Sequence, residues 1–242
     1  NGDVYNVWSK GSPYLDPFRA KQIDISYEHY FDEGGAVTAA VFYKDIESLI
    51  TSVSRGADEE WPGIDLPAGT TKGVYNTFKN TDDGGYIRGL ELAATKTFDN
   101  LPGVFAGLGF NANYSYTESE ASIGGGGLFP EQDLPLPGLS KNVWSATLFW
   151  DIGSFSTYAN VRYRDDYIFI MPVPGSTTPV RAKEYTTIDW QASYAFENGV
   201  SVVLQVNNLT DESNKVDYGV NSQLGEYKTF GRQMYVGVDY KF

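Results

Sequence analysis

Residues 233–242 read QMYVGVDYKF, and their side chains alternate between two faces. A period of two is the side-chain period of a β-strand, in which successive residues point to opposite sides of the sheet. One face of this segment is apolar and consists of Met234, Val236, Val238, Tyr240 and Phe242. The other face carries glutamine, tyrosine, glycine, aspartate and lysine. The segment therefore predicts a strand with one apolar and one wetter face, and the rest of the chain can be compared with it.

The composition supports a substantial fold but provides no membrane-spanning helix. Of 242 residues, 41% are hydrophobic and 15% aromatic, yet no apolar run approaches the ~18–20 residues that such a helix requires. The mean hydropathy of −0.33 resembles that of a soluble protein. In alternating strands, however, apolar and polar positions cancel in any averaging window. The low value therefore does not argue against a β-barrel in a membrane.

Several classes of chemistry are excluded by the residues that the chain lacks. There is no cysteine, which removes disulfides, cysteine-based zinc sites and cysteine nucleophiles. His29 is the only histidine, so it is interpreted as an interfacial residue and not as a metal ligand. The net charge of −13 and the pI near 4.4 oppose nucleic-acid binding, which requires clustered lysine and arginine. We expect no enzyme, no cofactor and no metal site.

Alternating segments recur along the whole chain. They are residues 22–31, 36–52, 73–98, 104–117, 144–152, 155–164, 188–196, 200–207 and 233–242. Short turns such as DEGG at 32–35 alternate with long polar connections. The long connections are residues 53–72, 119–138, 170–184 and about 212–228. This pattern predicts an all-β protein of about nine antiparallel strands, with short turns on one side and long loops on the other.

The asymmetry between turns and loops is typical of a transmembrane β-barrel. The predicted apolar face is almost free of charge, and the charged residues gather on the opposite face: Glu28, Glu91, Arg162, Arg164, Asp189 and Asp239. Aromatic residues lie near the short turns, where they are expected to form a girdle: Phe31, Phe98, Phe105, Trp150, Phe155, Phe196, Tyr240 and Phe242. A soluble all-β protein, whose aromatic residues would fill a core, is the alternative interpretation.

Five motifs, in this order, resemble those of the TonB-dependent receptors of Gram-negative outer membranes. They are SPYLDPF at 12–18 with IDISYEHYF at 23–31, YIRGLEL at 86–92, LPGLSK at 136–141, VNNLTDE at 206–212, and GRQMY at 231–235 with the final YKF. Each motif is short, but their order covers essentially the whole chain. Phe18 departs from the pattern, because the family usually has an acidic residue there.

The resemblance implies a barrel of about 22 strands around a plug domain, of which this chain would supply the last nine. Residues 1–242 are then the carboxy-terminal portion of the barrel domain, without the plug, the early strands or the TonB box. The implied location is the outer membrane. The implied partners are TonB, contacted through the missing amino-terminal region, outer-membrane lipid and lipopolysaccharide, and the barrel-assembly machinery. That machinery would read the terminal-strand residues Val236, Val238, Tyr240 and Phe242.

The function implied by the resemblance is TonB-coupled uptake of a scarce nutrient: a ferric siderophore, cobalamin or an oligosaccharide. A passive porin would show the same barrel signature without a plug, and a soluble β-structured binding module is a third possibility. Candidate ligand-binding residues on the predicted lumen face are Asn113, Arg162, Arg164 and Asp189, and those on loops are Trp61 and Phe129.

Each candidate residue also has a structural interpretation, as solvated wall or as packing against a plug. Two arginines on one lumen face could pair with siderophore or carboxylate oxygens, or with an acidic residue nearby. Loop aromatics could instead stack on sugar rings. The sequence NTDD at residues 80–83 offers oxygen ligands for calcium but lacks EF-hand spacing, so it is interpreted as a solvated turn.

Overall fold

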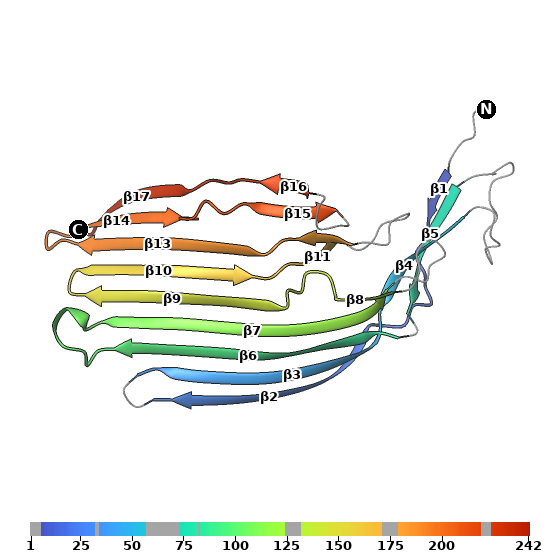
Figure 1. Ribbon diagram of the computed structural model, residues 1–242, viewed down its shortest axis with the longest axis horizontal. Coiled ribbons are helices and arrows are strands. Elements are labelled where there is room, and N and C mark those ends of the chain that lie inside the picture. Colours follow the sequence, from blue (N-terminus) through green and yellow to red (C-terminus); the bar gives the residue numbers. More distant parts are fainter. Residues whose placement is uncertain are drawn as a thin grey trace.

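A computed structural model describes residues 6–31, 34–56, 73–81, 83–123, 132–170, 179–218 and 224–242. Nine antiparallel strands form the main sheet in the order β17-β14-β13-β10-β9-β7-β6-β3-β2 (Figure 1). Their bounds are β2 (Arg19–Tyr30), β3 (Ala36–Ser48), β6 (Gly85–Phe98), β7 (Leu108–Ile123), β9 (Asn142–Ile152), β10 (Phe155–Arg164), β13 (Tyr185–Ala195), β14 (Val200–Asn207) and β17 (Gln233–Tyr240). Each predicted segment supplies one of these strands, so the prediction of an antiparallel sheet of about nine strands is confirmed.

The long connections differ from the prediction, because parts of them continue as strands, and the predicted segment 73–98 is divided into two strands that end at Asn80 and Phe98. Beyond the main sheet lie β1 (Asn6–Ser9), β4 (Ile50–Gly56), β5 (Gly73–Asn80), β8 (Gln132–Leu134), β11 (Tyr167–Ile170), β12 (Val180–Ala182), β15 (Asn214–Tyr218) and β16 (Leu224–Lys228). β4 pairs with β5, and β11, β12, β15 and β16 form a separate sheet. Main-chain pairing thus extends past the apolar band. The sequence did not reveal this, because these additional strands are only three to eight residues long, and short segments give a weak periodic signal.

One short connection also differs from the prediction. Residues 104–106 were expected to begin a strand, but η1 (Gly103–Phe105) is a turn of 3₁₀-helix and β7 begins at Leu108. Gly107 has a φ of 80°, and a Cβ at this position would lie 1.8 Å from the carbonyl oxygen of Asp151. The Gly107 carbonyl in turn accepts a hydrogen bond of 3.0 Å from the Asp151 N–H. The close approach of β9 therefore requires glycine at position 107, directly before β7.

Cross-strand register keeps the apolar residues of the nine strands on one face. Ile25 lies opposite Val41, Val41 opposite Leu90, and Leu90 opposite Tyr116. At the other edge, Leu204 lies opposite Val236. We call this side the apolar face and the other side the polar face. A slip of one residue at any strand would have mixed the two faces.

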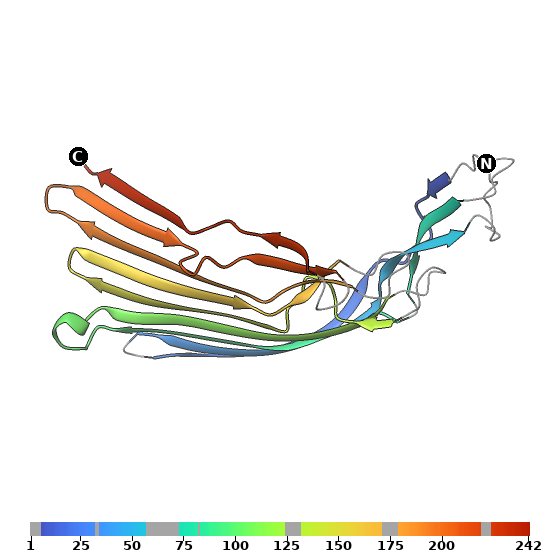
Figure 2. The same ribbon diagram turned by 45° about the horizontal axis from the view of Figure 1, so that its top comes forward.

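The apolar face is largely uncovered. The main sheet forms one curved layer, an open trough without a second layer across it (Figure 2). Val236 is 74% exposed and Leu148 67%, whereas few apolar residues of the described chain are buried: Ile46, Val53, Ala121, Ile168, Ala182 and Ala192. Among the described residues no helix has the length and apolar character needed to span a membrane. Strands β2 and β17 lie at the two edges of the main sheet, so the sheet does not close into a barrel here.

Aromatic side chains gather at both ends of the apolar face. At the short-turn end, Trp150 contacts Phe155 with ring centroids 5.6 Å apart, and Tyr194 contacts Phe196 at 4.7 Å. At the long-loop end, Trp144 stacks on Tyr163 at 5.6 Å. The sequence predicted the first girdle. The second was missed, because its members are not adjacent to any sequence signal for a turn.

Candidate functional site

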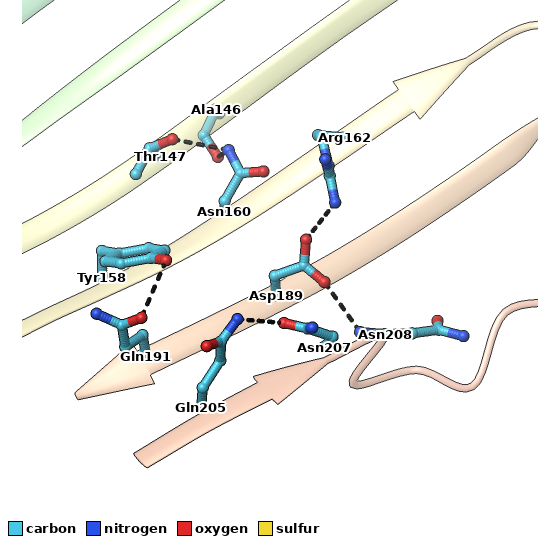
Figure 3. A network of polar contacts seen from close by, with 10 residues as sticks. All are labelled: Ala146, Thr147, Tyr158, Asn160, Arg162, Asp189, Gln191, Gln205, Asn207 and Asn208. Atoms are coloured by element: carbon cyan, nitrogen blue, oxygen red, sulfur yellow. Dashed lines mark hydrogen bonds and ion pairs between the residues drawn. The ribbon is translucent and has the colours of Figure 1, made fainter. Parts of the chain in front are cut away.

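The polar face carries a series of side-chain hydrogen bonds across strands β9, β10, β13 and β14 (Figure 3). Alternation places Asn160 on this face of β10, where its Nδ2 donates to Thr147 Oγ1 at 2.7 Å. The Tyr158 hydroxyl reaches Gln191 Oε1 at 3.5 Å. The wall is therefore lined by amide and hydroxyl groups that already satisfy one another, which suits a surface in contact with water or a polar occupant.

Asp189 is the central charged group of this series. Its Oδ2 forms an ion pair with Arg162 Nη2, and its Oδ1 accepts a hydrogen bond of 2.9 Å from the Asn208 N–H. The Asp189 side chain is 20% exposed, compared with 60% for Arg162. The sequence left two interpretations of Arg162, a contact to ligand oxygens or an ion pair with a nearby acidic residue. The structure shows the ion pair. Asp189 links β10, β13 and the turn after β14.

Arg164 lies two residues further along β10 and has a different environment. Its guanidinium carbon lies 4.1 Å from the ring centroid of Tyr167, a cation–π contact. Among the residues described here, Arg164 forms no ion pair with a carboxylate. Its side chain is exposed. Of the two candidate arginines, Arg164 is thus the one whose charge is not neutralised by a carboxylate of the described residues.

A hollow of about 470 Å³ brings three of the predicted residues together. Asn113, Arg162 and Arg164 line it, and Asn113 Nδ2 donates to Ser145 Oγ at 2.7 Å. Asp189 does not line the hollow but holds Arg162 beside it. Trp61 and Phe129 lie outside the described residues. The wall thus presents two arginines and several hydroxyl or amide groups toward one small volume.

Among the lining residues that sequence reasoning missed are three hydroxyl-bearing residues of the polar face, Ser145, Tyr185 and Thr187. Register brings them there, because Arg162 lies opposite both Ser145 and Thr187, and Arg164 lies opposite Tyr185. Their alternation within each strand was visible in the sequence. Which residue faces which depends on strand pairing, and a single sequence carries little information about that.

The rim of the wall next to the hollow is fixed by Asp165, which directly follows β10. Burial opposes ionisation of this carboxyl group, but hydrogen bonds from the Tyr163 hydroxyl and from Asn142 dominate and lower the pKa of Asp165. Further out, the ion pair of 2.7 Å between Lys183 Nζ and Asp217 Oδ2 raises the pKa of Lys183. Both groups therefore stay charged at neutral pH and tie neighbouring strands together.

The VNNLTDE motif has a structural role at the end of β14. Asn208 has a φ of 52°, in the left-handed region that asparagine tolerates better than most residues. Its side chain accepts a hydrogen bond from the Glu212 N–H at 2.8 Å and donates to the Glu212 carbonyl at 3.0 Å. The motif therefore closes a turn between β14 and β15 and, through the Asn208 N–H, supports Asp189.

The residues considered as metal ligands do not form a site in the part that the structure describes. No group of three or more histidine, aspartate and glutamate residues there could hold a metal ion. The His29 ring packs edge-on against Phe31 at 4.8 Å. The Asn80 side chain is hydrogen-bonded to Asp16, whose backbone N–H donates to Asn80 Oδ1 at 2.8 Å. Asp82 lies outside the described residues.

Comparison with known proteins identifies one protein family and several similar structures. The family described as "TonB dependent receptor-like, beta-barrel" matches residues 1–209. No curated protein matches. The siderophore receptor PiuA from Acinetobacter baumannii is 18% identical, with a TM-score of 0.63 over 94% of this chain and 29% of its own.

Two further solved structures are similar to the same extent. A mutant of the ferric enterobactin receptor PfeA from Pseudomonas aeruginosa is 16% identical, with a TM-score of 0.60 over 94% of this chain and 32% of its own. The copper transporter OprC is 16% identical, with a TM-score of 0.61 over 96% of this chain and 34% of its own. At these identities the similarity shows the fold. The chain spans about a third of the length of each of these proteins.

Proposed function

Because this chain belongs to the family of TonB-dependent receptor-like β-barrels, we propose that it forms part of an outer-membrane transporter for TonB-coupled nutrient uptake. Residues 1–242 would be the carboxy-terminal portion of the barrel domain. The observation that carries the proposal is the division of nine registered strands into an uncovered apolar face and a hydrogen-bonded polar face. An uncovered apolar face of this extent is stable against lipid, and the polar face then lines the lumen.

This family consists of receptors, and the similar structures are receptors and transporters, not enzymes. The expectation that the chain is not an enzyme agrees with that class. The partners proposed here are TonB, contacted through a region outside this chain, the barrel-assembly machinery, which would read the β17 residues Val236, Val238, Tyr240 and Phe242, and the lipids of the outer membrane.

For the ligand, we propose an anionic metal chelate of the siderophore type, in preference to cobalamin or an oligosaccharide. The support is the hollow beside Arg164, whose planar guanidinium is suited to carboxylate or other chelate oxygens. Arg162 and Asp189 form an ion pair that connects β10 and β13 beside the hollow. Asn113 supplies a polar contact to the ligand. Trp61 and Phe129 are proposed as loop contacts from the sequence alone.

The test is uptake by cells that produce the protein at its natural length. Binding of a ferric siderophore should not depend on TonB, whereas accumulation should stop when TonB is deleted. Accumulation that continues without TonB would instead identify a passive porin. Recovery of the protein in buffer without detergent would defeat both membrane functions and leave a soluble binding module.

The specificity is tested in the same cells with Arg164→Gln and, as the matched control, Lys44→Gln. Lys44 is also on the polar face but lies away from the hollow, on β3. Loss of binding only with Arg164→Gln supports the proposed site. Equal binding by both variants and the wild type would reject Arg164 as a ligand contact.

A further inference from the structure

The junction between β10 and β11 is fixed at one residue, Asp165, whose polar groups are all hydrogen-bonded. Its N–H donates to the Asn142 carbonyl at 2.9 Å, and its carbonyl accepts a hydrogen bond of 2.9 Å from Ser140 Oγ. In the side chain, Oδ1 accepts from the Tyr163 hydroxyl, and Oδ2 accepts from the Asn142 N–H at 3.1 Å. The pairing between β9 and β10 thus continues one residue past the end of β10.

The same junction is tied to β7 and to the LPGLSK motif at residues 136–141. Asn142 Oδ1 accepts a hydrogen bond of 2.8 Å from the Tyr114 hydroxyl, which belongs to β7. The motif contributes Ser140, which is 6% exposed, and the Gly138 N–H, which donates to the Ile168 carbonyl at 2.9 Å. Strands β7, β9 and β10 and one loop segment therefore converge on the start of the connection to β11 (Figure 1).

The residue directly before this junction is Arg164, the last residue of β10. Its guanidinium lies over the ring of Tyr167, at the start of β11, so Asp165 lies between the arginine and the ring beneath it. Asp165 does not line the hollow, whereas Arg164 does. Because strand ends fray when their hydrogen bonds are few, the bonds of Asp165 determine how firmly the main chain of Arg164 is held.

We propose that Asp165 is a positioning residue of the ligand site, which acts through Arg164 and does not touch the ligand. By holding the end of β10 and the start of β11, it keeps the guanidinium directed at the hollow before an anionic chelate arrives. Such preorganisation strengthens binding, because less side-chain and main-chain freedom is lost in the complex. The inference rests on the proposed function, since it requires Arg164 to contact the ligand.

The first experiment needs no ligand and uses the protein at its natural length in detergent. Residues 1–242 contain no cysteine, so a spin label at Arg164→Cys is the only one in this part of the protein, and the same protein without that change gives the background signal. Electron paramagnetic resonance should show a more mobile label when Asp165→Ala is added. Asp166→Ala is the matched control, because the Asp166 carboxylate pairs with Arg181 at 3.2 Å instead. Equal label mobility in both variants would overturn the proposal.

The second experiment is a double-mutant cycle on the dissociation constants of ferric citrate and of a ferric catecholate siderophore. Asp165→Ala should raise the dissociation constant about three- to tenfold, the cost of ordering one mobile side chain on binding. In the Arg164→Gln background the same change should have no effect, because no guanidinium is left to position. A loss of equal size in both backgrounds would show general support of the wall and would reject the positioning role.

Asp165→Asn should fall between the wild type and Asp165→Ala, since an amide oxygen can still accept from the Tyr163 hydroxyl. Heat-modifiable electrophoretic mobility establishes that each variant is folded. The two proposals fail in different ways. Wild-type protein that binds neither chelate would reject the proposed ligand class, while the label at position 164 would still decide whether Asp165 orders that residue. Binding that is lost with Arg164→Gln but unchanged with Asp165→Ala would keep the ligand site and reject the role of Asp165.

Discussion

At the scale of single residues, the polar face separates two arginines that the sequence presents as equivalent. Arg162 is paired with Asp189, whereas Arg164 lies over Tyr167 and has no carboxylate partner in the described part of the chain. The difference follows from what lies opposite and beside each residue, since Asp189 faces Asn160 in the register and reaches Arg162 diagonally. A ligand with anionic oxygens would therefore gain more binding free energy from Arg164 than from Arg162, because no ion pair with a described residue has to be broken.

Arg164→Gln is expected to raise the dissociation constant of a ferric siderophore about tenfold or more, the equivalent of one hydrogen bond between charged groups. Arg162→Gln should raise it less, because that guanidinium is engaged by Asp189. Arg164→Lys should restore little, since an ammonium lacks the planar fork. Whole-cell binding of a radiolabelled ferric siderophore measures all three. An order of effects reversed between Arg162 and Arg164 would contradict the assignment.

Asp189→Ala is expected to lower the free energy of unfolding by about 1–3 kcal/mol, because it leaves the Asn208 N–H without its acceptor and removes the partner of Arg162. Arg162→Gln should cost about 1 kcal/mol or less, because that side chain is exposed. Urea unfolding in detergent, followed by tryptophan fluorescence, compares the two. Equal losses would show that Asp189 does not support the turn after β14.

Asp165 is expected to make stability depend on acid pH. Its hydrogen bonds hold the folded-state pKa below the ~3.9 of an unfolded aspartate, so the stabilising contribution is complete above about pH 4. That contribution is lost as the pH falls through the folded-state pKa. The free energy of unfolding is measured with urea at pH values between about 2.5 and 6, in steps of about half a unit. At the acid end, Asp165→Asn should remove part of the stability loss that the wild type shows. Parallel profiles for the two proteins would show that Asp165 is not responsible.

The sequence predicted the individual candidates better than their arrangement. Alternation placed Asn113, Arg162, Arg164 and Asp189 on one face, and the structure agrees. It could not place Tyr185 beside Arg164, because that neighbour is determined by the register between β10 and β13. The contacts of Trp61 and Phe129 stay predictions.

At the scale of the element, a period of two is easy to read only where one face of a strand meets an apolar environment. The nine main strands have that asymmetry, and their existence was predicted from the sequence. β11, β12, β15 and β16 extend beyond the apolar band, and each has only three to five residues, too few to show a period. The proline and glycine residues near these strands led to a prediction of loops, although the strands pair through main-chain hydrogen bonds.

The turn after β14 offers a test at this scale. Asn208→Ala should destabilise the protein by about 1–2 kcal/mol, because it removes both hydrogen bonds to Glu212 and places alanine at a positive φ. Asn208→Gly relieves the backbone strain but not the lost hydrogen bonds, so its cost should be smaller. Thermal unfolding in detergent measures both. A glycine variant less stable than the alanine variant would contradict this explanation of the motif.

At the scale of the whole molecule, the described sheet has two unpaired edges. β2 and β17 are the first and last strands of the path, and neither has a second neighbour in the main sheet among the described residues. Unpaired main-chain groups at such edges are not tolerated in lipid and promote pairing between chains in water. The similar structures are about three times as long as this chain.

Residues 1–242 produced alone and refolded into detergent are therefore expected to associate into oligomers or aggregates through β2 and β17. Light scattering and analytical ultracentrifugation measure the mass, and the protein at its natural length, isolated from the outer membrane, is the control that should remain a single barrel. Proline substitutions that block one edge, such as Val236→Pro in β17, should reduce association of the isolated segment. A monodisperse particle of 26.8 kDa with native strand content would contradict the open-edge description. It would then favour a small barrel that closes on itself, in which β2 pairs directly with β17.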